Sequence, residues 1–137
     1  MDKFFVDSDI ILDLLSGRQP HYNAAAELFS LADEGTIRIF VSSLSFSNVN
    51  YILSRQYHGD QARKKLLKFK TLVSILSVNE KTIELALASE FKDFEDAIQY
   101  YTAIENDITT LLTRNLKDFR KADISVLTAE QFLKSLE

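Results

Sequence analysis

The sequence predicts an α/β fold, in which a central, mostly parallel sheet of four to five strands lies between layers of helices. The first reason is that short apolar runs alternate with segments of helical periodicity along the whole chain. The second is that helical segments separate consecutive strands, as parallel strands require. The 137 residues, of which 46% are hydrophobic and 26% charged, suit one domain over residues 1–137 with a continuous core.

Five segments have the apolar, β-branched or aromatic character of strands. The first is the short run Phe4-Phe5-Val6, and the second is rich in Ile, Phe and Val. The third, from Leu72, is expected to follow directly on a helix, whose end its first residues can also form. The strands are expected at residues 4–6, 36–41, 72–78, 108–113 and 124–127.

Helical segments fill the intervals between the first four of these strands, and another follows the fifth. Ile and Leu at helical spacing give the first helix an apolar face, and Gly17 closes it. Pro20 opens the second helix and Gly35 ends it. Ser42 starts the third, which the Gly-Asp pair at 59–60 breaks. The remaining helices are expected over residues 61–70, 80–89 and 94–105 and from residue 129 onward.

Composition excludes several classes of function. The chain has no cysteine, so it has neither a disulfide scaffold nor a cysteine-based zinc site or nucleophile. It has only two histidines, His21 and His58, which excludes a histidine-rich metal site. The net charge of −4 argues against a protein that holds nucleic acid by bulk charge. Because no signal peptide or membrane span is apparent, we expect a cytoplasmic protein without a membrane partner.

Acidic residues follow two of the expected strands and open one helix. Asp7 and Asp9 come after the first strand, Asp118 lies beyond the fourth, and Asp93 and Asp96 stand at the start of the 94–105 helix. Ligands of parallel sheets bind beyond the carboxyl ends of the strands. Converging carboxylates repel one another unless a cation lies among them, and oxygen ligands suit Mg²⁺ or Mn²⁺. The alternative for each acid is an ordinary helix cap, and spacing alone leaves both interpretations open.

Four motifs resemble those of the PIN-domain family, in the same order and over nearly the whole chain. The first is Val6-Asp7-Ser8-Asp9-Ile10, and the second is Asp93-Phe94-Glu95-Asp96-Ala97. The third is Thr113-Arg114-Asn115-Leu116-Lys117-Asp118, and the closing strand and helix follow from Ile124. The resemblance implies a three-layer PIN-like fold and a Mg²⁺- or Mn²⁺-dependent endoribonuclease. It also implies the toxin of a VapC-like toxin–antitoxin pair, with RNA as substrate, a small antitoxin as partner and a homodimer.

The resemblance also assigns roles to residues. It implies that Asp7, Asp96 and Asp118 are the catalytic and metal-binding carboxylates and that Asp93 is a further metal-site acid. Three more residues, Ser8, Asp9 and Asn115, are expected to support the site.

One position departs from the pattern of the family. PIN domains usually carry Glu on the helix after the second strand, where this chain has Asn48. The chain is similar to a subgroup that combines this Asn with the Asp-Phe-Glu-Asp motif. An amide oxygen still binds Mg²⁺ or a metal-bound water, although it brings no charge. The alternative is therefore a weak or inactive PIN-fold module that binds RNA or protein. A receiver-like phosphotransfer domain is disfavoured, because no lysine follows a late strand at the position it requires.

Basic residues form two groups. Arg114, Lys117, Arg120 and Lys121 surround Asp118, where they are expected to meet substrate phosphate or to be solvated loop residues. A second basic segment runs through residues 55–70, for which a solvated helical face is the favoured interpretation.

Overall fold

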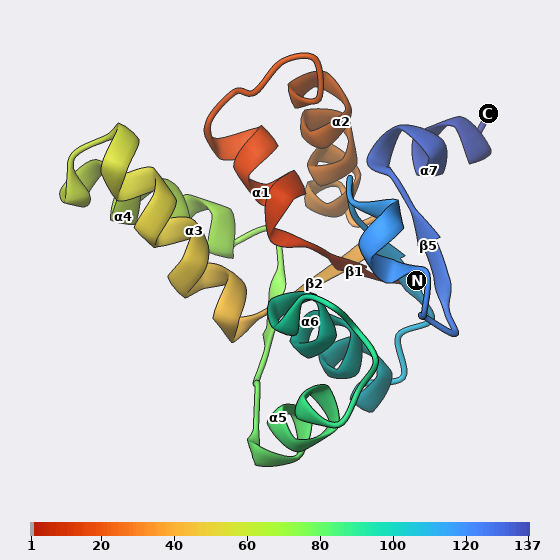
Figure 1. The fold of residues 1–137 in the computed structure, drawn as a ribbon. Helices are drawn as coiled ribbons and strands as arrows, with labels where there is room; N and C mark the ends of the chain where they lie inside the picture. Colours follow the sequence, from red (N-terminus) through yellow and green to blue (C-terminus); the bar gives the residue numbers. More distant parts are fainter. Residues whose placement is uncertain (1) are drawn as a thin grey trace.

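The computed structural model describes residues 2–137, and an all-parallel sheet of five strands lies at its centre (Figure 1). The order of the strands across the sheet places the first strand in the middle, between the second and the fourth. The residues that follow the first and fourth strands therefore meet at one edge. In chain order the strands are β1 (Lys3–Val6), β2 (Arg38–Ser42), β3 (Ser74–Leu76), β4 (Thr110–Leu112) and β5 (Ser125–Leu127).

Helices connect the strands. Two glycines end helices as the sequence predicted: Gly17 and Gly35 adopt the left-handed conformation, at φ of 62° and 79°, just beyond the first and second helix. None of the helices within residues 2–137 has the length and apolar character needed to cross a bilayer. The helices are α1 (Ser8–Leu15), α2 (Tyr22–Asp33), α3 (Ser43–Gln56), α4 (Gly59–Lys70), α5 (Glu80–Leu87), α6 (Phe94–Glu105) and α7 (Ala129–Ser135), with a 3₁₀ helix η1 (Leu116–Phe119).

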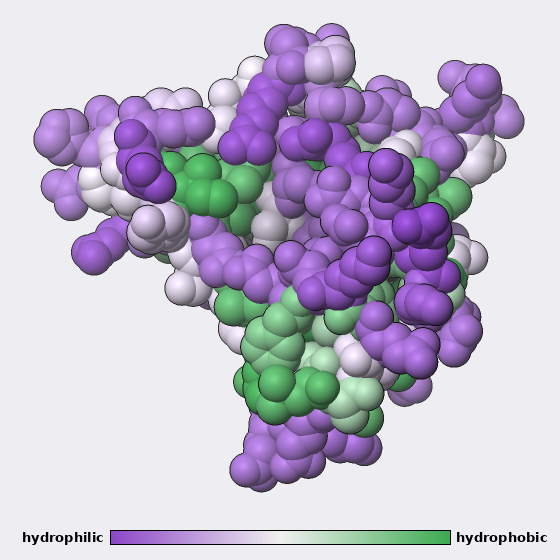
Figure 2. Space-filling model, viewed as in Figure 1, coloured by the Kyte–Doolittle hydropathy of each residue, from purple (hydrophilic) through white to green (hydrophobic). Residues whose placement is uncertain are grey.

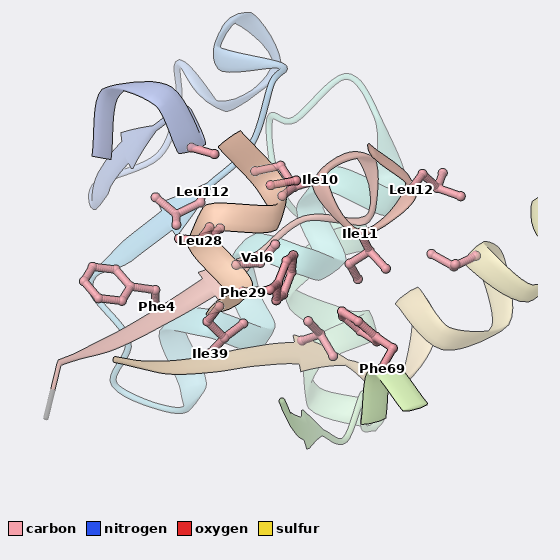
Figure 3. Packing of buried hydrophobic residues seen from close by; sticks show 14 of the residues in the cluster. Phe4, Val6, Ile10, Ile11, Leu12, Leu28, Phe29, Ile39, Phe69 and Leu112 are labelled. Carbon is pink, nitrogen blue, oxygen red and sulfur yellow. The ribbon is translucent and has the colours of Figure 1, made fainter. Parts of the chain in front are cut away.

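Alternating side chains of the strands form a core on each face of the sheet. Phe4 and Val6 pack with α1, α2, α3, α4 and α7 in the larger cluster (Figure 3). Phe5, between them in sequence, points to the opposite face, where it packs with Tyr100 and Ala103 of α6. The result is three layers: helices, sheet and helices.

The predicted α/β, PIN-like class with a parallel sheet is confirmed, but several boundaries were wrong. The third strand is only Ser74–Leu76. Leu72 instead closes the last turn of α4, the alternative that the sequence left open, through its N–H to the carbonyl of Phe69 at 2.9 Å. The fourth strand starts at Thr110, because the Ile108 N–H bonds back to the carbonyl of Ala103 at 3.0 Å. No sequence pattern predicted η1.

Candidate active site

Asp7 lies where β1 ends and α1 begins. Its carboxylate accepts hydrogen bonds from the Ser8 N–H (2.8 Å to Oδ1) and from the Thr113 hydroxyl (2.9 Å to Oδ2). The residue is buried, at 6% exposure. Asp7 is thus the N-cap of α1, as the simpler interpretation held, and it is also tied to the residue that follows β4.

Asp9, in the first turn of α1, is held by the same loop. Its Oδ2 accepts from the backbone N–H of Arg114 at 2.9 Å and from the Thr113 hydroxyl at 3.3 Å. Its Oδ1 is buried and has no hydrogen-bond partner among the described residues. An unpaired buried carboxylate oxygen costs free energy unless some other group satisfies it. This oxygen is therefore available to a ligand.

The start of α6 brings two further acids to this edge. Asp93 is the N-cap of the helix, and its Oδ1 accepts from the Asp96 N–H at 3.0 Å. Asp96 is half-buried and stands in the first turn. Asp93 is therefore a cap as well as a member of the site, and its cap fixes the backbone of Asp96.

These acids line one pocket of about 210 Å³ at the carboxyl edge of the sheet. We call it the acidic pocket. The structure brings together in it every carboxylate that the sequence selected, along with Ser8 and Asn115, but Asn48 is not part of its lining. Glu95 and Gln99 line it although they were not selected. The lining consists of Asp7, Ser8, Asp9, Asp93, Glu95, Asp96, Gln99, Asn115 and Asp118.

Gln99 connects this pocket to the start of α3. Its side-chain Nε2 donates to the Ser45 hydroxyl at 2.8 Å and to the Ser8 hydroxyl at 3.4 Å. The Ser8 hydroxyl also donates to that of Ser45 at 3.0 Å, and Ser45 reaches Ser42 at 3.2 Å. Gln99 is 2% exposed, and its Oε1 has no partner within residues 2–137. The signal that would have found it is its place one turn after Asp96, on the same face of α6.

Burial and crowding raise the pKa values of the acids. Burial, with the charge of Asp9 as the next cause, raises the pKa of Asp7 from 3.8 to about 7. Burial raises the pKa of Asp9 as well. The pKa of Asp96 rises to about 7, first through burial and then through the charges of Asp93 and Asp118. The carboxylates therefore lie close enough to oppose one another's ionisation, and a cation among them would reverse this effect.

The residues present fit a hard divalent cation. Carboxylate and amide oxygens are the ligands of Mg²⁺ and Mn²⁺. Asp9 Oδ1 and Gln99 Oε1 are buried, and neither has a hydrogen-bond partner in the part of the chain that the structure describes. Within residues 2–137, no three acidic or histidine side chains already stand at direct metal-ligand spacing.

The basic residues near Asp118 divide into two groups. Arg114 points to α1, where its Nε donates to Asp13 Oδ2 at 2.8 Å. Lys117 and Arg120 instead line a second and larger pocket beside the acidic one. Figure 2 shows that the surface over η1 is hydrophilic.

Comparison with known proteins identifies the family. Residues 3–117 match the PIN domain, so the chain belongs to the PIN-domain family. Within it, the chain is a relative of "Ribonuclease VapC1" of Aquifex aeolicus (strain VF5), with 31% identity over 96% of this chain and 93% of that protein.

Solved structures share the fold. A toxin–antitoxin complex from Klebsiella pneumoniae is 26% identical, with a TM-score of 0.68 over 91% of this chain and 96% of that one. VapBC2 from Rickettsia felis, bound to a DNA fragment from its promoter, has a TM-score of 0.67 at 20% identity over the same shares.

Proposed function

We propose that this chain is a metal-dependent endoribonuclease, formed by a single PIN domain over residues 1–137, that acts as the toxin of a toxin–antitoxin pair. The observation that carries the proposal is the acidic pocket, where acids from the end of β1, the start of α6 and η1 converge. Burial, and after it the charges of neighbouring acids, raises the pKa values of Asp7 and Asp96, which supports a site where a cation would offset both effects. The kinship with a protein named a ribonuclease supports RNA as the substrate.

In this proposal, Asp7, Asp96 and Asp118 hold Mg²⁺ or Mn²⁺, and Asp93 adds a fourth negative charge. A divalent ion in such a site orients and acidifies a water and stabilises negative charge on a phosphate. Thr113 fixes the Asp7 carboxylate through its hydroxyl. Asp9 adds negative charge beside Asp7. The pocket therefore attracts a cation before any substrate binds.

The supporting residues give the pocket its shape. Ser8 and Gln99 join α1, α3 and α6 through the hydroxyl of Ser45, which fixes the three helices relative to one another. Asn115 is the N-cap residue of η1 and lies immediately before the turn that carries Asp118. The neutral Asn48 lies outside the lining of the acidic pocket. The negative charge of the site comes from the acids that line it.

Purified protein tests the enzymatic part. After treatment with a chelator, the wild type should cleave single-stranded RNA only when Mg²⁺ or Mn²⁺ is returned. Asp7→Asn and Asp96→Asn should each slow cleavage at least about a hundredfold. Glu84→Gln on α5 is the control, because it removes the same charge from an exposed position outside the pocket. Cleavage that needs no metal, or that survives both substitutions, would favour a non-catalytic binding module with a contaminating nuclease.

The toxin role needs a partner. Two of the similar structures are a toxin–antitoxin complex and a VapBC pair, so we extend an antitoxin partner to this chain. Expression of the chain alone should stop growth, and Asp96→Asn should not. Co-expression of the protein encoded by the adjacent reading frame should restore growth and co-purify with the chain. A homodimer is the assembly we propose for the free chain, and light scattering tests it.

A further inference from the structure

A second pocket adjoins the acidic pocket. It measures about 600 Å³ and lies between the loop before α6 and the η1 region. Two of its lining residues, Asp93 and Asp118, also line the acidic pocket, so the two pockets are neighbours that share these carboxylates. A volume of this size falls within the ~300–1,000 Å³ of pockets that bind small organic groups. We call it the basic pocket.

The charges of the basic pocket differ from those of its neighbour. It is lined by four basic side chains, Lys92, Lys117, Arg120 and Lys121. The one acid that it does not share with the acidic pocket is Glu90, which pairs with Lys121 at 3.8 Å. The side chains of Lys92, Lys117 and Arg120 form no ion pair with any residue in the described part of the chain. Three cationic groups are therefore available to an anion beside the acidic pocket.

An aromatic ring forms part of the same wall. Phe91 is half-buried and lines the basic pocket. Its ring packs against Tyr100 (centroids 5.1 Å apart), Phe119 (6.0 Å) and Tyr101 (6.4 Å). Packing on three rings fixes the orientation of Phe91. A base that stacks on this ring therefore costs little side-chain entropy of Phe91. Aromatic rings flanked by Lys and Arg are the usual elements of single-strand binding.

We infer that the basic pocket holds the RNA nucleotide next to the cleaved bond. The base of this nucleotide would stack on Phe91, and the phosphate on its far side from the cleaved bond would contact Lys117 and Lys92. The inference rests on the proposed function, because it gives that function its substrate subsite. The acidic pocket would hold the cleaved phosphodiester through its cation, and the shared carboxylates of Asp93 and Asp118 lie between the two subsites. The RNA strand would then lie in one direction across the two pockets, with this nucleotide in the basic pocket.

The variants Lys117→Ala and Phe91→Leu test this subsite by steady-state cleavage of a hexanucleotide RNA. Each should raise KM about tenfold and leave kcat within about twofold. For Lys117→Ala, the slope of the logarithm of affinity against that of salt concentration should fall by about 0.7. The matched control is Lys64→Ala, which removes the same charge from an exposed position of α4 and should match the wild type. Lys117 is exposed, so its variant tests the subsite even where Phe91→Leu impairs folding.

Chemically altered RNA separates a phosphate contact from a general charge effect. A neutral methylphosphonate replaces, one at a time, the phosphate on either side of the cleaved one. At one of these two positions it should weaken wild-type binding about tenfold and leave Lys117→Ala unchanged, because the contact is already lost. Two results would overturn the subsite while cleavage itself remained. One is equal KM values for Lys117→Ala and Lys64→Ala. The other is a methylphosphonate that weakens binding by Lys117→Ala as much as it weakens binding by the wild type, at both replaced phosphates. A wild type that cleaves no RNA would overturn the proposed function and the subsite together.

Discussion

Arg114 and Asp13 form an ion pair, Nε to Oδ2 at 2.8 Å, that joins the loop after β4 to helix α1. The Asp13 side chain is 2% exposed and that of Arg114 is 29% exposed. The backbone N–H of Arg114 is also the donor to Asp9. One residue thus holds two acids of α1, and it fixes the loop that leads to Asn115 and Asp118.

Replacing Arg114 should therefore destabilise the fold. Arg114→Ala leaves the buried Asp13 carboxylate without its cation, so we expect the free energy of unfolding to fall by about 2 kcal/mol. Urea denaturation followed by circular dichroism measures it. Adding Asp13→Asn should recover part of the loss, since the neutral amide needs no cation. Arg120→Ala is exposed and should stay within about 0.5 kcal/mol of the wild type. Equal effects of the two arginine variants would contradict the structural role of this pair.

The raised pKa values predict how stability depends on pH in the absence of metal. Between pH 3.8 and about 7, folded Asp7 and Asp96 retain protons that the unfolded chain has lost. The free energy of unfolding should therefore decrease as pH rises through this window and become level above it. Urea denaturation in chelator across this range checks the slope. Stability that stays level or rises with pH would contradict the raised pKa values of these two acids.

Asp7→Asn should remove much of that slope. The neutral amide keeps the hydrogen bond from Ser8, and the Thr113 hydroxyl still has Asp9 as an acceptor. At about pH 8 we expect the variant to be more stable than the metal-free wild type by about 1–2 kcal/mol. Asp33→Asn, at an exposed position of α2, is the control and should keep the full slope. A variant less stable than the wild type at both ends of the range would show that burying this carboxylate costs nothing.

For Asn48, the family resemblance and the geometry of the structure lead to different expectations. Family position places it where Glu is usual, but it is not part of the lining of the acidic pocket. We therefore expect Asn48→Ala to change the rate of RNA cleavage by less than about threefold, far below the loss in Asp96→Asn. Single-turnover cleavage compares the two variants. A loss in Asn48→Ala as large as that in Asp96→Asn would place the amide among the groups that act on substrate.

Local sequence signals predicted most of the fold. The periodicity of α1 and α6 and the glycines after α1 and α2 are local features, and these elements lie where the sequence placed them. The lengths of β3 and β4 were wrong because their flanking residues complete helix ends through backbone hydrogen bonds. Such bonds depend on chain geometry rather than on residue type, so hydrophobic character alone overestimates short strands.

The acidic pocket was only partly predictable from spacing. Asp93 and Asp96 are three residues apart, so one helix turn brings them together. The approach of Asp7 to the loop after β4 depends on the pairing of β1 with β4, which no local signal gives. Arg114 and Asp13 are separated by 101 residues, so no local signal predicts that the side chain expected to meet phosphate also pairs with α1. In the sequence, Gln99 has no feature that distinguishes it from an ordinary helix residue, although in the structure it lines the acidic pocket.

The binding of Mn²⁺ by the metal-free protein, followed by calorimetry, tests most directly whether the acidic pocket is a cation site. The wild type should bind Mn²⁺, Asp96→Asn should bind it at least about tenfold more weakly, and Glu84→Gln should bind it as the wild type does. A wild type that binds no Mn²⁺, or equal affinities for all three proteins, would contradict the assignment of Asp7, Asp96 and Asp118 as its ligands.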